Sequence, residues 1–141
     1  MNILGLNIFH ADSSACLIVD GKIIAASEEE RHNRIKHFIG FPTNSIRYCL
    51  NYANLDMKNI DLITINFNPF YNIKNKILFA LKKPNFGLFN RYQRYVDRYN
   101  LKKLFKENLD TEISSKILRV PHHLSHISSS YLISGFKECI G

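Results

Sequence analysis

The sequence of 141 residues contains no tryptophan, four prolines, six glycines and three cysteines. The cysteines, Cys16, Cys49 and Cys139, have no paired spacing, which favours reduced cytosolic thiols over a disulfide framework. No apolar run approaches the roughly 18 residues that span a bilayer. The first residues have neither the basic segment nor the small-residue cleavage site of a signal peptide. We therefore expect a cytoplasmic protein without a membrane segment.

Acidic residues are almost missing from one part of the chain. Residues 74–106 contain ten Lys and Arg and only Asp97 as an acid, so the net charge of this segment is +9. The rest of the chain has a net charge of −2, which gives the formal total of +7. Such a segment can face a nucleic acid, an acidic partner, a phosphorylated substrate or solvent. Its predicted helix at 89–105 interleaves Arg with aromatic residues, and such a stripe more often packs on a core while the charges are solvated. We therefore do not expect nucleic acid to be the partner.

Apolar periodicity and turn signals predict five strands and three main helices. The predicted strands cover residues 3–9, 14–19, 22–27, 60–67 and 116–120. The predicted helices cover residues 43–54, 89–105 and 122–133. The order β-β-β-α-β-α-β-α, with right-handed crossovers after an antiparallel start, is that of the ribonuclease H-like fold of actin-like ATPases. We expect an α/β fold in which a mixed five-stranded sheet has helices on both faces. It would form a single ribonuclease H-like subdomain over residues 1–141, with a basic helical segment at about 70–112.

His122 and His126 are four residues apart near the start of the last predicted helix. On a helix the two imidazoles lie on one face and can share a divalent metal ion. The polar first turn of an ordinary helix has the same composition, so the spacing alone leaves both interpretations open.

The turn between the first two predicted strands is polar. It contains His10, Asp12 and Ser13, and Ser14 follows directly. Its hydroxyls and amides can bind an anion, or they can stabilise the turn through local hydrogen bonds. An imidazole such as that of His10 can accept a proton from a hydroxyl near neutral pH.

The charged segment 28–40 is predicted to be a functional loop. Lys36 provides a compact positive charge suited to phosphate, and Arg34 lies close to it in the sequence. The alternative is a solvated loop whose cations pair with Glu28, Glu29 and Glu30.

Three blocks of sequence, in order, resemble the carbamoyltransferase family, which includes nodulation-factor, cephamycin and tobramycin O-carbamoyltransferases. They are Gly-Leu-Asn-Ile-Phe-His-Ala-Asp-Ser-Ser-Ala-Cys-Leu with its following hairpin, Arg-Ile-Lys-His-Phe-Ile-Gly-Phe-Pro, and His-His-Leu-Ser-His-Ile-Ser-Ser-Ser-Tyr. The N-terminal part is also similar to threonylcarbamoyl-tRNA enzymes. Residues 70–112 carry no motif of the family.

The resemblance implies transfer of a carbamoyl group from carbamoyl phosphate, through an ATP-derived carbamoyl-adenylate, to a hydroxyl acceptor. It implies iron or zinc at His122 and His126, with an aspartate from outside this chain as third ligand, and it makes His10 the candidate general base. Lys36 is then a candidate catalytic residue. The candidate substrate and phosphate contacts are Asp12, Ser13, Ser14 and Arg34.

Because members of the family are longer, we expect an N-terminal portion that is incomplete without a C-terminal half or a partner subunit. Two alternatives stay open. One is a threonylcarbamoyl-tRNA-type or RNA-binding relative that uses residues 74–106, and the other is a non-catalytic remnant.

Overall fold

The structure is a computed structural model that describes residues 1–68, 74–75, 78 and 100–138. The chain divides into two compact units, residues 1–68 with 114–141, and residues 69–113. Most of the basic segment, including the predicted helix from residue 89 to residue 99, lies outside the described residues. Within the described ranges, no helix combines the length and the apolar character needed to cross a membrane.

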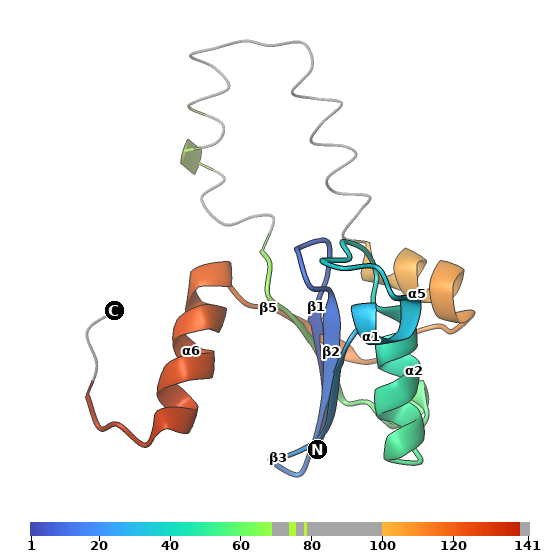
Figure 1. The fold of residues 1–141 in the computed structure, drawn as a ribbon, viewed down its shortest axis with the longest axis horizontal. Coiled ribbons are helices and arrows are strands. Elements are labelled where there is room, and N and C mark those ends of the chain that lie inside the picture. The colour runs from blue at the N-terminus through green and yellow to red at the C-terminus, as the bar shows by residue number, and fades with distance from the viewer. Residues whose placement is uncertain (69–73, 76–77, 79–99, 139–141) are drawn as a thin grey trace. The chain divides into compact units, whose positions relative to one another are not determined.

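The first unit is built on one five-stranded sheet with the spatial order β3-β2-β1-β4-β5 (Figure 1). The strands are β1 (Asn2–Asn7), β2 (Ser14–Val19), β3 (Lys22–Glu28), β4 (Leu62–Ile65) and β5 (Lys116–Arg119). β2 is antiparallel to β1 and β3, whereas β4 is parallel to both β1 and β5. The predicted mixed sheet is therefore confirmed. The fourth strand is shorter than predicted at both ends.

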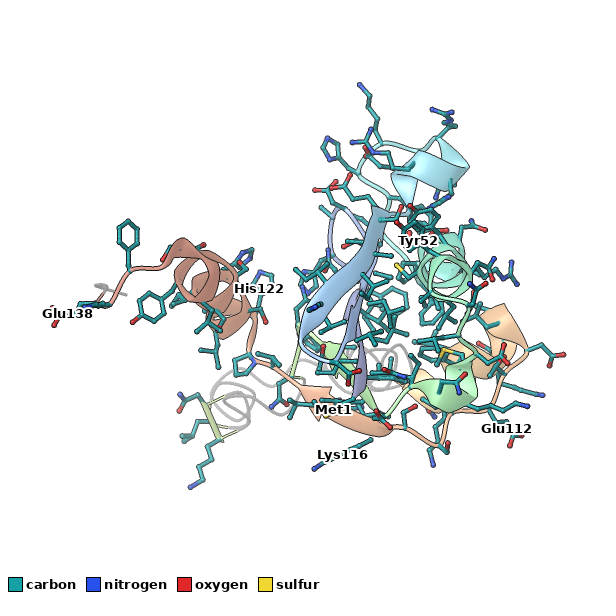
Figure 2. All side chains as sticks on the ribbon, turned by 90° about the horizontal axis from the view of Figure 1, so that it is seen from below. Met1, Tyr52, Glu112, Lys116, His122 and Glu138 are labelled. Atoms are coloured by element: carbon teal, nitrogen blue, oxygen red, sulfur yellow. The ribbon has the colours of Figure 1, made fainter. Side chains whose placement is uncertain are left out.

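Successive side chains of a strand point to opposite faces of the sheet, and one of the two sets is buried in the core. Leu4, Leu6 and Ile8 are buried along and just beyond β1, as are Ile63 and Ile65 on β4. The long helix α2 (Thr43–Tyr52) packs against β2 and β3. The helix α6 (His122–Ser134) lies on the other side of the sheet (Figures 1 and 2). Helices on both faces, as predicted, are thus observed.

The shorter elements complete the described chain. They are α1 (Glu30–Asn33), the 3-10 helix η1 (Met57–Asn59) and, in the second unit, α5 (Leu101–Leu109). α5 begins after Asn100, whose side chain accepts a hydrogen bond from the Lys103 N–H. α6 ends at the predicted stop, Gly135, where a φ of 74° suits glycine.

The N-terminus of α2 is capped by a residue from another segment. Its own N-cap position, Pro42, offers no side-chain acceptor. Instead, the buried carboxylate of Glu29 accepts hydrogen bonds from the backbone and side chains of Asn44 and Ser45. A carboxylate is favoured at this end of a helix because it satisfies free N–H groups and opposes the helix dipole. The Glu29 backbone N–H donates to the Ser13 carbonyl, so this residue also holds the β1–β2 turn.

Candidate functional site

Three parallel strands, β1, β4 and β5, end at the same edge of the sheet. The Val120 N–H donates to the Ile65 carbonyl over 2.9 Å, which continues the β4–β5 pairing up to the start of α6. His10 follows β1, Asn66 follows β4, and His122 follows β5. In open α/β sheets ligands bind beyond the carboxyl ends of the strands. This edge is therefore the candidate site.

The three histidines predicted to be functional meet at this edge. The rings of His10 and His122 are stacked, with centroids 4.9 Å apart and an interplanar angle of 16°. His10 also contacts the ring of Phe67, at a centroid distance of 5.9 Å. Burial lowers the pKa of His10, and the neighbouring imidazoles of His122 and His126 lower it further. The turn after β1 and the first turn of α6 are thus brought together.

The His122 and His126 imidazoles converge across one turn of α6. Their Nε2 atoms are 3.0 Å apart. Two nitrogens bound to one tetrahedral zinc ion at about 2.0–2.1 Å would lie roughly 3.3 Å apart, so the observed spacing fits two adjacent ligand positions. Within residues 1–68 and 100–138, no cluster of three or more His, Cys, Asp or Glu side chains is placed to hold a metal ion. The described chain therefore offers a pair of ligands, and the third ligand stays a prediction.

Ser13 does not have the placement expected for a phosphate contact. It is fully buried, and its Oγ accepts a hydrogen bond from the Gly40 N–H while lying within donating distance of the His10 and Gly40 carbonyls. Its backbone N–H donates to the Phe38 carbonyl. Since the hydroxyl is already used by the loop, we correct its role to a structural one. Ser13 fixes the charged loop to the turn that carries His10.

Asp12 is joined to the charged loop by a side chain that the sequence did not single out. Its Oδ1 lies 2.9 Å from the His37 Nδ1, and this hydrogen bond raises the pKa of His37. Arg34 and Lys36 are exposed on the same loop. Asp12, Arg34 and His37 all have positive φ, and in Arg34 this left-handed conformation ends α1.

The loop cations were alternatively expected to pair with the three consecutive glutamates, and among the described residues this holds for Arg31 but not for Arg34 or Lys36. Glu28 pairs with Arg31 at 3.7 Å. Glu29 caps α2, and Glu30 accepts a hydrogen bond from the His37 N–H. The exposed loop cations therefore keep their predicted role as candidate anion contacts.

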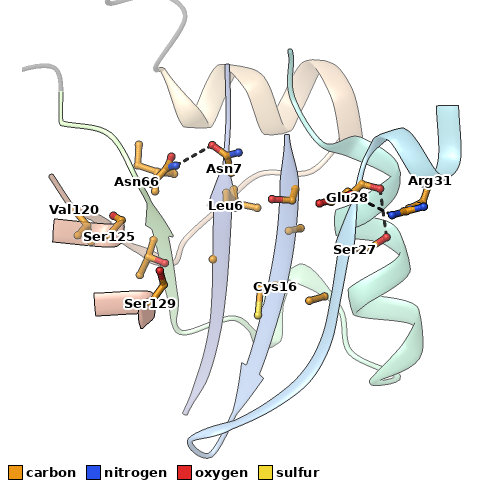
Figure 3. A pocket seen from close by; sticks show the side chains of 16 residues that line it. Leu6, Asn7, Cys16, Ser27, Glu28, Arg31, Asn66, Val120, Ser125 and Ser129 are labelled. Carbon is orange, nitrogen blue, oxygen red and sulfur yellow. Dashed lines mark hydrogen bonds and ion pairs between the residues drawn. The ribbon is translucent and has the colours of Figure 1, made fainter. Parts of the chain in front are cut away.

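A pocket of about 720 Å³ lies between the sheet and α6 (Figure 3). Its lining is rich in hydroxyl and amide groups, contributed by Asn7, Ser14, Ser27, Thr64, Asn66, Ser125 and Ser129. Ser14 is the member of this set that the sequence had singled out. Apolar side chains such as Leu6 and Ile65 complete the lining, and His10, His122 and His126 are not part of it.

Asn7 and Asn66 were missed by the sequence interpretation. The Asn7 Nδ2 donates to the Ala11 and Asp12 carbonyls at 3.0 and 2.9 Å, and its Oδ1 accepts from the Asn66 Nδ2 at 2.8 Å. Figure 3 shows the two carboxamides side by side at the ends of neighbouring strands. The available signal was a polar residue directly after each of two buried strands.

Residues 2–139 match the family described as Carbamoyltransferase N-terminus. The chain belongs to this family. It is 36% identical over 137 residues to Nodulation protein NolNO of Sinorhizobium fredii, and 31% identical over 147 residues to an uncharacterized protein of Synechocystis. These matches cover 95% and 97% of this chain but only 19% and 24% of the relatives. The carbamoyltransferase N-terminal chain thus spans a quarter or less of the length of these relatives.

The fold of this carbamoyltransferase N-terminal chain is similar to that of YeaZ from Pseudomonas aeruginosa. The TM-score is 0.51 at 14% sequence identity, covering 95% of this chain and 50% of that one. At this identity the likeness concerns the fold alone. It confirms the ribonuclease H-like, actin-like fold expected from the order of strands and helices.

Proposed function

We propose that this chain forms the carbamoyl-transfer site of an O-carbamoyltransferase. The group would come from carbamoyl phosphate, activated with ATP as a carbamoyl-adenylate, and pass to a hydroxyl acceptor. The observation that carries the proposal is the stacking of His10 on His122, which puts the turn histidine and the histidine pair at one strand edge in a chain of this family.

The chemistry requires a base beside the carbamoyl carbon. The acceptor hydroxyl oxygen attacks that carbon, the carbon–oxygen bond to the phosphate breaks, and AMP leaves with the bonding electrons. His10 Nε2 accepts the hydroxyl proton. Support for this role is that His10 Nε2 is buried without a hydrogen-bond partner among the described residues, as expected of an atom that faces a ligand.

Cations on the charged loop bind the phosphate of the donor in this proposal. Lys36 and Arg34 are exposed on a segment that Ser13 and Gly40 fix to the β1–β2 turn. Positive charge close to the leaving phosphate stabilises the negative charge that develops there. We propose that the Ser14 hydroxyl, which lines the pocket, contacts the same substrate.

His122 and His126 would hold iron or zinc through their Nε2 atoms. When bound, such an ion supplies positive charge that polarises a carbonyl oxygen. The 3.0 Å separation of the two nitrogens supports this assignment. The relatives are four to five times longer than the region matched here. We propose that additional polypeptide of this kind provides the third ligand, the adenylate-forming activity and the opposite wall of the site.

A hybrid enzyme tests the proposal. The matched region of the Sinorhizobium fredii relative is replaced by this chain, and the hybrid is given [14C]carbamoyl phosphate, ATP and a panel of hydroxyl-bearing acceptors. We expect AMP formation that depends on carbamoyl phosphate, together with labelled acceptor. The matched control carries His122→Ala and His126→Ala and should lose labelled acceptor. A soluble hybrid that forms AMP but no labelled acceptor, assayed beside an active parent, would contradict the proposal.

A further inference from the structure

We infer that Asn66 recognises the NH2 group of the carbamoyl donor and so distinguishes a carbamoyl group from an acyl group of similar size. The inference rests on the proposed function and deepens it. It assigns a specificity role to a residue that neither the sequence motifs nor the histidine cluster includes.

The direction of the Asn66 carboxamide is fixed by a chain of hydrogen bonds. Two backbone carbonyls, those of Ala11 and Asp12, face the Asn7 side chain, so its Nδ2 must point toward them. The Asn7 Oδ1 is then the acceptor that faces Asn66, and Asn66 must present its Nδ2 there, at 2.8 Å. Exchanging oxygen and nitrogen in either carboxamide would set like groups against each other.

The remaining Asn66 oxygen therefore points away from Asn7 and can only accept. This Oδ1 is buried, and it has no hydrogen-bond partner among the described residues. Buried acceptors are normally satisfied in folded proteins, so an orphaned one at a pocket wall calls for a donor from a ligand.

The inference places Asn66 beside the reacting group of the donor because its neighbour in the chain contacts His10. It directly follows β4 and precedes Phe67, whose ring contacts His10. A carbamoyl group offers N–H donors beside its carbonyl carbon, whereas an acetyl group of nearly the same size offers a methyl group. The methyl group would leave the Asn66 oxygen unsatisfied, and sites built around a hydrogen bond reject such analogues strongly.

Binding to the 141-residue chain tests this inference without turnover. The probes are freshly dissolved carbamoyl phosphate and acetyl phosphate, titrated at low temperature by 1H–15N NMR. We expect wild-type protein to prefer carbamoyl phosphate by about tenfold or more, and Asn66→Leu to bind both probes alike. Ser125→Ala, which removes another hydroxyl from the pocket wall, should keep the preference.

The outcomes separate the inference from the proposed function. Equal binding of the two probes by wild-type protein, or an Asn66→Leu variant that keeps the preference, overturns the role of Asn66 and leaves the proposed function standing. Binding of neither probe by wild-type protein also overturns the role assigned to Asn66, whereas the proposed function is decided separately by the hybrid enzyme. If Asn66→Leu fails to fold, wild-type protein with [15N]carbamoyl phosphate decides, because a nuclear Overhauser effect between the carbamoyl NH2 and Asn66 Hβ is required and its absence refutes the contact.

Discussion

The carboxylate of Glu29 accepts hydrogen bonds from the backbone N–H of Ser45, at 2.8 Å, and from its hydroxyl, at 2.9 Å. The second carboxylate oxygen accepts from the backbone and side chain of Asn44. One buried side chain thus joins the end of β3 to the start of α2. Through its backbone bond to Ser13, the same residue also supports the turn that carries His10.

Replacing Glu29 by Ala should destabilise the fold strongly. It leaves several buried donors of the first turn of α2 without an acceptor, and we expect a loss of about 2–4 kcal/mol in the free energy of unfolding. Urea denaturation measures it. Glu28→Ala, which removes only a partly exposed ion pair with Arg31, should cost less than about 1 kcal/mol. Equal losses in the two variants would contradict the capping role.

Cys49 should be unreactive in the folded protein. Burial raises the pKa of its thiol to about 11, and the Sγ donates to the Ala15 carbonyl. At pH 8 only about one such thiol in a thousand is ionised, and the thiolate is the reactive form. In a Cys16→Ser, Cys139→Ser background, a thiol reagent at pH 8 should label Cys49 only after urea is added. Rapid labelling of the native protein would contradict the burial of Cys49 in the core.

The bond between Asp12 and His37 should make the stability of the charged loop depend on pH. The hydrogen bond to Asp12 raises the pKa of His37 above its ordinary value of 6.5. The protonated imidazole therefore stabilises the folded state. This contribution is fully present below pH 6.5 and is lost as pH rises through the raised pKa. NMR titration of the His37 ring should show its pKa fall in Asp12→Asn. An unchanged pKa would rule out the pair in solution.

The sequence predicted the order of elements and the main histidines because both depend on short-range patterns. Apolar alternation and the Asp20-Gly21 turn identified the antiparallel start, and both turn residues have the positive φ that such a hairpin requires. The four-residue spacing placed His122 and His126 on one helical face. These features survive in the structure because the sheet is built from segments that each bury one face.

The roles that the sequence did not reveal depend on contacts between segments far apart in the chain. Glu29 looked like one of three solvated acids, since nothing local indicates that a helix beginning at Thr43 points its free N–H groups at it. Ser13 looked like an anion contact because its partner, Gly40, lies in a separate loop. Asn66 acquires its orientation only when β1 and β4 pair.

The central claim is that the histidine pair of α6 is a metal site of a carbamoyltransferase. Calorimetric titration of the 141-residue protein with zinc tests it most directly, with His123→Ala as the matched control because this neighbour lies outside the pair whose Nε2 atoms meet. We predict that wild-type protein and His123→Ala bind zinc with similar affinity and that His122→Ala/His126→Ala loses binding. Zinc binding that is undiminished in the double variant would contradict the assignment of His122 and His126 as the ligand pair.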